Sequence, residues 1–459
     1  MRYTTTLFIS ASFFLLFICH FGLSQRLRVS ENQRYLQHHD GTPFFWLGDT
    51  AWELFHRLDR EEADMYLKNR ADKRFTVIQA VVLAELDGLN TPNPYGETPL
   101  LNNDPTQPNE AYFKHVDYIV DKAESLGLYV GMLPSWGDKF NKRWGVGPEV
   151  FTPENARVFG AFLGERYKDK PIIWILGGDR IPEENDDFAI IRAMAEGLKE
   201  GDGGNHLMTY HPMGDRNSAE FFHRDEWLDF NMFQSGHGSR DKPNYQMTLA
   251  NYALNPVKPT LDGEPCYEDH PINWKPEKGW FNEKDIRKAA YWSMLSGALG
   301  HTYGNHNIWQ MWQEGREPVS SARTPWYEAL DHPGAYQMGY MRELFESRSF
   351  TDLVPDADLV VSSKGETNFV AAARGSDFLM VYVPAHESVE VNPQKISGKK
   401  INVWWFDPRT GDSVSLGKYK NNRNYTFRTP ITERDWVLII DDVAKAYSTP
   451  GDMLFGMNE

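Results

Sequence analysis

From about residue 43 the chain alternates short apolar runs with longer segments of helical periodicity. Eight apolar runs predict strands, and they span residues 43–50, 75–83, 128–136, 171–179, 206–212, 229–237, 259–264 and 300–307. Between them, apolar residues at three-to-four spacing predict helices over residues 60–73, 110–127, 153–169, 187–200 and 283–300. This eightfold alternation predicts an α/β fold, a closed (β/α)8 TIM barrel. An open doubly wound sheet is the alternative, but no Gly-rich phosphate loop follows the first strand.

The pattern changes on both sides of this repeat. A hairpin with an Asp40-Gly41 turn is predicted before the first strand, so the barrel domain is expected over residues 25–345. After a helical connection over residues 324–350, short apolar runs separated by turn residues predict a small antiparallel β-sandwich domain over residues 350–447. Its strands are expected at 358–363, 368–375, 377–384, 401–412, 424–430 and 435–442.

The first residues are typical of a secretory signal peptide over residues 1–24. One Arg precedes an apolar stretch at 7–21, and Gly22 and Ser24 suit the small-residue positions of a cleavage site. The stretch is too short to span a bilayer comfortably. We therefore expect a secreted or periplasmic protein, with a lipoprotein anchor at Cys19 as the alternative and no other membrane association.

The composition of the chain limits the kinds of molecule that it is expected to bind. The chain carries 48 basic and 64 acidic residues, a formal charge of −16, so a nucleic acid would be repelled. Its 15 Trp, 21 Tyr and 27 Phe residues suit a large core and also supply flat faces for sugar rings. Without the signal peptide only Cys266 remains, so no internal disulfide can form. No cofactor is expected.

Polar and aromatic residues collect where the predicted strands end. The active site of a (β/α)8 barrel lies at the C-terminal ends of its strands, so these residues are expected to meet. A single Asp or His at such a position is more often a helix cap or a hydrogen-bonded core residue, but the set favours substrate binding. The set comprises Asp49, Trp52, Gln79, Trp136, Asp179, His211, Gln234, His237, Glu264, Tyr303 and His306.

Two carboxylates in this set, Asp179 and Glu264, are the candidate catalytic residues. The run "PIIWILGGDR" ends a buried strand in two glycines and Asp179, which by itself is also ordinary turn composition. Glu264 closes the seventh strand, and strands four and seven face each other across a barrel mouth. Glycoside hydrolysis requires two carboxyl groups flanking the scissile bond. We interpret Asp179 as the general acid/base and Glu264 as the nucleophile of a retaining mechanism.

The arrangement resembles the retaining (β/α)8 glycosidases, whose fourth strand ends in Asn-Glu; here Gly178 and Asp179 stand at those positions. A narrower resemblance, over about residues 36–345, is to the apiosidase-like glycoside hydrolases, family 140. It rests on "PFFWLGDTAWELFHRL", "FTVIQAVVL", "PNEAYFKHVDYIV", "WILGGDR", "MTYHPMG", "WLDFNMFQSGH", "DGEPCYEDH" and "GHTYGNHNIWQM". The resemblance implies an exo-acting enzyme that removes terminal β-D-apiose from rhamnogalacturonan-II, a plant cell-wall pectin. The C-terminal domain resembles one named for collagen binding, but no protease constellation accompanies it.

Exo-action predicts a closed pocket at the mouth, bounded by the loops 84–108 and 137–151. Tyr267 is expected to contact sugar. Glu268 is expected to support the nucleophile or hydrogen-bond near it, and to replace Glu264 in that role if the predicted register of the seventh strand is wrong.

Other activities remain open. One is a glycosidase acting on another furanoside or plant glycan. A metal-dependent hydrolase could use Glu268, Asp269 and His270, but the usual His-x-His and His-Glu-x-x-His spacings are absent, so no metal site is predicted. A non-catalytic barrel could hold glycan on Trp52, Trp136 and Trp144.

Overall fold

The computed structural model describes residues 26–361 and 367–452. The predicted signal peptide and Cys19 lie outside the described residues. Within these residues, no helix is both long and apolar enough to cross a membrane.

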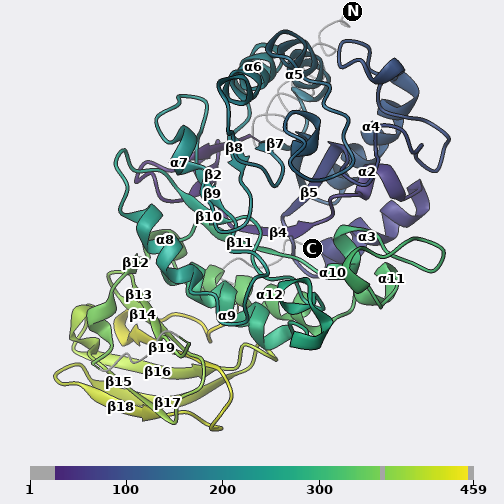
Figure 1. The fold of residues 1–459 in the computed structure, drawn as a ribbon. Coiled ribbons are helices and arrows are strands. Elements are labelled where there is room, and N and C mark those ends of the chain that lie inside the picture. The colour runs from purple at the N-terminus through teal and green to yellow at the C-terminus, as the bar shows by residue number, and fades with distance from the viewer. Residues whose placement is uncertain (1–25, 362–366, 453–459) are drawn as a thin grey trace, which may run out of the picture.

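Eight parallel strands form the barrel (Figure 1). They are β4 (Trp46–Thr50), β5 (Val77–Leu83), β6 (Tyr129–Ser135), β7 (Ile172–Gly177), β8 (Met208–His211), β9 (Asn231–Phe233), β10 (Thr260–Asp262) and β11 (Gly300–Tyr303). Six pair in the order β11-β4-β5-β6-β7-β8, and β9 and β10 pair with each other. Single main-chain hydrogen bonds join the two groups, from Asp229 to Met208 and from Leu299 to Thr260, each 2.9 Å. All eight strands fall within the predicted runs, which confirms the predicted barrel.

Helices surround the strands (Figure 1). They are α2 (Leu54–Arg57), α3 (Arg60–Asp72), α4 (Glu110–Ser125), α5 (Pro153–Tyr167), α6 (Asn185–Asp202), α7 (Ala219–Phe222), α8 (Asn244–Tyr252), α9 (Glu283–Met294), α10 (His306–Trp309), α11 (Trp326–Ala329) and α12 (Pro333–Glu346). Local chemistry fixes their starts: Asp59 and Asn282 cap α3 and α9 through reciprocal capping boxes. The predicted connection at 324–350 consists of α11 and α12.

A small antiparallel sheet precedes the barrel. It comprises β1 (Leu27–Val29), β2 (Leu36–His38) and β3 (Pro43–Phe44). Gly41 adopts φ 93° in the predicted turn, where the backbone N–H of Thr42 donates to Asp40. Phe44 packs on Tyr129, the first residue of β6, so this sheet lies at the barrel end opposite the mouth.

The C-terminal domain has two antiparallel sheets. One has the order β12-β13-β14-β19-β16-β17 and the other pairs β15 with β18. The strands are β12 (Val354–Pro355), β13 (Ala371–Arg374), β14 (Phe378–Val383), β15 (Ser388–Val391), β16 (Lys400–Phe406), β17 (Ser413–Lys420), β18 (Tyr425–Arg428) and β19 (Trp436–Asp442). The strand predicted at 358–363 is wrong for its described part, because Ala357–Leu359 forms a 3₁₀ helix. β12, β15 and β17 had no predicted counterpart; β17 is largely exposed and lacks an apolar run.

The central strands β14 and β19 of the larger sheet are buried on both faces. One face packs inside the sandwich, where Leu379, Val381 and Leu438 belong to its separate apolar core. On the other face Met380, Tyr382 and Ile439 join the apolar core of the barrel. Figure 1 shows this domain, coloured green to yellow, beside α9 and α12. The two domains therefore share a continuous apolar core.

Candidate active site

A pocket of about 550 Å³ opens at the C-terminal ends of the barrel strands. The sequence-predicted residues that line it are Trp52, Trp136, Asp179, Gln234, His237, Glu264 and Tyr267. Each predicted loop also contributes to the lining, with Glu85 from 84–108 and Trp144 from 137–151. The mouth therefore combines carboxylates with aromatic faces in one cavity.

The two glycines at the end of β7 allow the chain to turn where neighbouring backbone leaves no room for a side chain. Gly177 and Gly178 have φ of 95° and 100°, a region that favours glycine. A Cβ on Gly178 would lie 2.9 Å from the Cα of Trp136, and one on Gly177 would lie 2.5 Å from the carbonyl oxygen of His211. Asp179 follows with φ 54°, which is uncommon for a non-glycine residue and concentrates at functional sites. The turn thus places the Asp179 side chain in the pocket.

Among the described residues, no Lys, Arg or His side chain forms an ion pair with Asp179. Its Oδ2 accepts a hydrogen bond from the Trp144 indole at 3.2 Å. The neighbouring Arg180 guanidinium instead donates to the main-chain carbonyls of Asn141, Asp179 and Trp144. Burial and then the charge of Glu264 raise the pKa of Asp179 to about 7. Asp179 can therefore hold a proton near neutral pH, as a general acid must.

Glu264 has the opposite environment. His237 Nε2 hydrogen-bonds its Oε1 at 3.0 Å, and His211 Nε2 lies 3.0 Å from its Oε2 in an ion contact without hydrogen-bond alignment. Burial alone would raise the pKa of Glu264, but the two histidines outweigh burial and lower it to about 2. Glu264 is therefore ionised where Asp179 is protonated, as a nucleophile facing an acid requires.

His211 links the two carboxylates from behind the pocket wall. The backbone N–H of Asp179 donates to its Nδ1 at 3.2 Å, so this nitrogen acts as the acceptor. In a neutral imidazole the ring proton then sits on Nε2, which faces Glu264. One histidine thus positions the acid's backbone and stabilises the charge of the nucleophile.

Several polar atoms in the pocket wall are buried and lack a hydrogen-bond partner among the described residues. They are Trp136 Nε1, Gln234 Oε1, His237 Nδ1 and the Tyr267 hydroxyl. Leaving such a group unsatisfied costs about 1 to 3 kcal/mol. Donors and acceptors left open in one cavity suit a ligand rich in hydroxyl groups.

Six other sequence-predicted residues do not line the pocket, and their side chains have partners behind its wall. Asp49 accepts hydrogen bonds from Tyr66 and Arg70, and Gln79 donates to the Gly263 carbonyl at 3.0 Å. Glu268 accepts from Tyr303 at 2.6 Å and from the backbone of Gly334. His306 contacts the Val319 and Ser320 carbonyls, and His211 has the contacts given above. These placements favour structural or positioning roles over direct contact with substrate.

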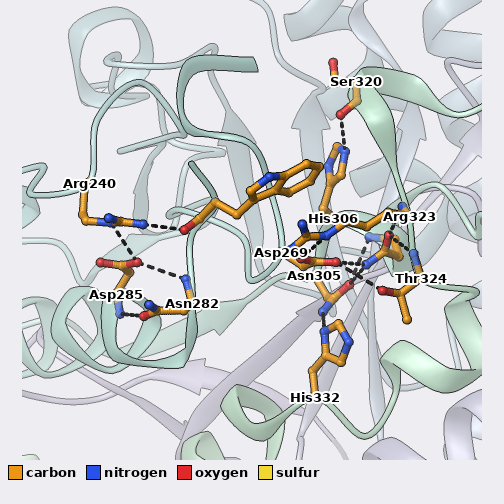
Figure 2. Close-up of polar contacts among 12 residues, drawn as sticks. Arg240, Asp269, Asn282, Asp285, Asn305, His306, Ser320, Arg323, Thr324 and His332 are labelled. Atoms are coloured by element: carbon orange, nitrogen blue, oxygen red, sulfur yellow. Dashed lines mark hydrogen bonds and ion pairs between the residues drawn. The ribbon is translucent and has the colours of Figure 1, made fainter. Parts of the chain in front are cut away.

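The three residues considered for metal ligation point to separate partners. Asp269 accepts hydrogen bonds from Arg323 and Thr324 (Figure 2). His270 contacts the Pro271 carbonyl, and Glu268 has the partners given above. Within residues 26–361 and 367–452, no group of three or more His, Cys, Asp or Glu side chains is arranged to hold a metal ion.

Sequence reasoning missed several pocket residues. Glu85 lies two residues beyond β5, whereas the strand-end reading selected Gln79 in the middle of that strand. Trp274 ends a 3₁₀ helix after β10, and Trp309 is the last residue of the short helix α10 after β11. The end of the apolar run "VIQAVVLAE" would have indicated Glu85, but no periodic signal marks the two tryptophans.

Fold and site together define a (β/α)8 hydrolase with two opposed carboxyl groups, and comparisons with known proteins agree. The family described as "Apiosidase-like, catalytic domain" matches residues 30–352, and "Putative collagen-binding domain of a collagenase" matches residues 354–441. The chain belongs to the apiosidase-like family and is a glycoside hydrolase.

Solved structures support the same class. A structure titled "Glycoside hydrolase" is 36% identical, with a TM-score of 0.85, and the match covers 92% of this chain and 98% of that one. A glycoside hydrolase family 5 structure from Bacteroides vulgatus ATCC 8482 is 35% identical, with a TM-score of 0.86 and coverage of 93% and 95%. No curated protein matches the sequence.

Proposed function

We propose that the protein is an exo-acting β-D-apiosidase that cleaves terminal apiose from side chains of rhamnogalacturonan-II with retention of configuration. The observation that carries the mechanism is the pair of carboxyl groups in one pocket, with a pKa of about 7 for Asp179 and about 2 for Glu264. Between these values one group is an acid and the other an anion, the division of roles that retaining glycosidases use.

The two steps use these groups in turn. Glu264 attacks the anomeric carbon while Asp179 gives its proton to the departing glycosidic oxygen, which forms a glycosyl-enzyme ester and releases the rest of the glycan. Asp179, now ionised, takes a proton from a water that attacks the same carbon and frees Glu264. His211 and His237 stabilise Glu264 as an anion before attack and as the leaving group afterwards.

The substrate assignment rests on the family and on the site. The family description names apiosidases, and a pocket of about 550 Å³ offers room for a terminal sugar and part of the next residue. Gly178 has no side chain at the position where retaining barrels place an Asn, which fits a branched furanose without the ordinary pyranose layout. Cleavage of the predicted signal peptide would place the enzyme outside the cytoplasm, where it would meet this polysaccharide.

The test is to incubate the protein with rhamnogalacturonan-II oligosaccharides and identify the released monosaccharide. The expected product is apiose, and proton NMR at early times should show that it is released as the β anomer. Release of another sugar would leave the proposed mechanism intact and show that the substrate is a different furanoside or plant glycan. Binding without any release would support a non-catalytic glycan-binding barrel, and initial release of the α anomer would show inversion.

A further inference from the structure

A third carboxyl group, Glu85, lies in the pocket and is used by neither step of the proposed mechanism. It follows β5 by two residues and its side chain is half-buried in the pocket lining. Within the described part of the chain, its carboxyl group forms no hydrogen bond or ion pair. An unpaired carboxyl group in the lining of the pocket is within reach of a bound ligand.

The surrounding charges make Glu85 differ from its neighbours. Glu53 is paired with His56 at 2.5 Å and contacts Arg57, while Asp138 is paired with Lys139 at 2.8 Å. Among the residues that the structure describes, no Lys, Arg or His side chain forms an ion pair with Glu85. Burial, and then the charges of Glu53, Asp179, Asp138 and Glu264, raise the pKa of Glu85 well above its ordinary range.

A neutral carboxylic acid has one O–H donor and one carbonyl acceptor on adjacent oxygens. Two neighbouring hydroxyl groups of a sugar present the complementary acceptor and donor. An ionised carboxylate could only accept, and would add to the negative charge that already faces the nucleophile. The neutral form therefore suits a cavity that must hold an uncharged, hydroxyl-rich ligand beside an anionic Glu264.

We propose that Glu85 is a specificity-determining residue that binds adjacent hydroxyl groups of the terminal sugar as a neutral acid. The proposal rests on the proposed function, since it assumes a terminal sugar in this pocket. Two further atoms on the pocket wall support it: the buried Trp136 Nε1 is an unpartnered donor and the buried Gln234 Oε1 an unpartnered acceptor. Asp179 and Glu264 are oriented by protein contacts, whereas Glu85 is free to be oriented by the ligand.

The test compares Glu85→Ala with Glu85→Gln. Both remove the ionisable proton, but the amide keeps one donor and one acceptor in nearly the same shape. Glu85→Ala should raise KM about 10- to 100-fold, the loss expected for one or two hydrogen bonds to a sugar, with a smaller fall in kcat. Glu85→Gln should raise KM at least fivefold less. The control is Glu61→Ala, on the exposed surface of α3.

A pH readout separates binding by a neutral acid from a merely structural role. The KM of the wild type should rise as pH passes upward through the raised pKa of Glu85, whereas the KM of Glu85→Gln should stay flat. Equal losses in both variants would show that the charged form binds and would overturn the proposal. An unchanged KM in Glu85→Ala would do the same.

The outcome remains separable from that of the proposed function. If the wild type releases apiose and Glu85→Ala binds it normally, only the role of Glu85 fails. If the wild type releases a different sugar, the apiose assignment fails, and the same two variants are then measured on that sugar. Circular dichroism and the Tm of each variant establish that it is folded.

Discussion

The barrel mouth and the barrel–sandwich interface both bury carboxyl groups, but they treat them in opposite ways. At the interface, Arg287 binds both oxygens of Asp435 at 2.7 Å, and Arg348 binds both oxygens of Asp441 at 2.8 and 2.9 Å. In the mouth no Lys or Arg side chain forms an ion pair with Asp179 or Glu85 within the described residues. Arginine pairing thus fixes the charge of Asp435 and Asp441 at the interface, whereas Asp179 and Glu85 have no arginine to hold them ionised.

Arg180 shows how this difference is maintained. It directly follows Asp179 in the chain, yet its guanidinium is stacked 3.8 Å from the Trp144 ring centroid and donates to three main-chain carbonyls. An arginine bound to the Asp179 carboxylate would lower its pKa and remove the acid. The loop at 137–151, through Asn141 and Trp144, therefore holds the Arg180 guanidinium away from an ion pair with Asp179.

Replacing Glu264 by Ala tests the mouth and should have the largest effect. Without a nucleophile the rate on the natural glycan should fall about 10³-fold or more, over 4 kcal/mol of barrier. The Tm at neutral pH should fall while the protein stays folded, because the change leaves His211 and His237 without their anionic partner but removes no apolar core residue. The measurements are kcat, KM and thermal unfolding, with Glu277→Ala, an exposed surface residue, as the control. Near-normal turnover would remove Glu264 from the mechanism.

Replacing Arg348 by Ala tests the interface. Arg348 and Asp441 have side-chain exposures of 0% and 2%, so the variant leaves a buried charge without a partner and should lose about 3 to 5 kcal/mol of unfolding free energy. The kcat of the folded fraction should be unchanged. The matched control is Lys68→Ala, which breaks an ion pair exposed at 67% and 63% and should cost less than about 1 kcal/mol.

The same variant also tests whether the two domains unfold together. Because they share an apolar core, denaturant unfolding should show one transition by fluorescence and by circular dichroism. Two separate transitions, with only the sandwich destabilised, would contradict a shared core.

Replacing Asp179 by Ala should have a smaller and substrate-dependent effect. Natural glycans need a proton on the leaving oxygen and should lose about 10²- to 10⁴-fold in kcat/KM, whereas nitrophenyl glycosides should lose far less. In the wild type, kcat/KM on the natural glycan should fall as pH rises above about 7, where Asp179 loses its proton. The variant should lack this decline on the nitrophenyl substrate. Equal losses on both substrates would contradict the acid role.

Strand positions could be predicted from the sequence because buried parallel strands are continuous apolar runs. Runs of this kind mark β5, β6 and β7 most clearly, and the same signal found β14 and β19. The signal failed for β17, a largely exposed edge strand in which Ser, Gly and Lys interrupt the apolar residues. Exposed strands have no burial requirement and therefore leave no apolar signature.

The candidate site was predictable only in part, since sequence places a residue at a strand end without its side-chain partners. Asp49 lies near the end of β4 and His306 follows β11, so both were expected beside Asp179 and Glu264. Arg70 on α3 instead binds Asp49, and the Val319 and Ser320 carbonyls hold His306. These contacts join residues separated by 13 to 21 positions, within loops and helices that no strand pattern describes.

The last prediction separates the two mouth carboxyls by their effect on stability. The folded-state pKa of Asp179 is raised to about 7 from an ordinary 3.8, so its contribution is fully present below about pH 4 and is lost as pH rises through 7. Asp179→Asn should therefore stabilise the protein at pH 8, by on the order of 1 kcal/mol after screening in the open pocket, and should have little effect at pH 4.

Glu264 should show the opposite sign. Its folded-state pKa is lowered from 4.5 to about 2, so its contribution is present above about pH 4.5 and is lost as pH falls through 2. Glu264→Gln should therefore destabilise the protein at pH 8, where Asp179→Asn stabilises it. Unfolding in urea at pH 4 and pH 8 measures both variants against the wild type. Shifts of the same sign at pH 8 would contradict the assignment of one carboxyl as acid and the other as anion.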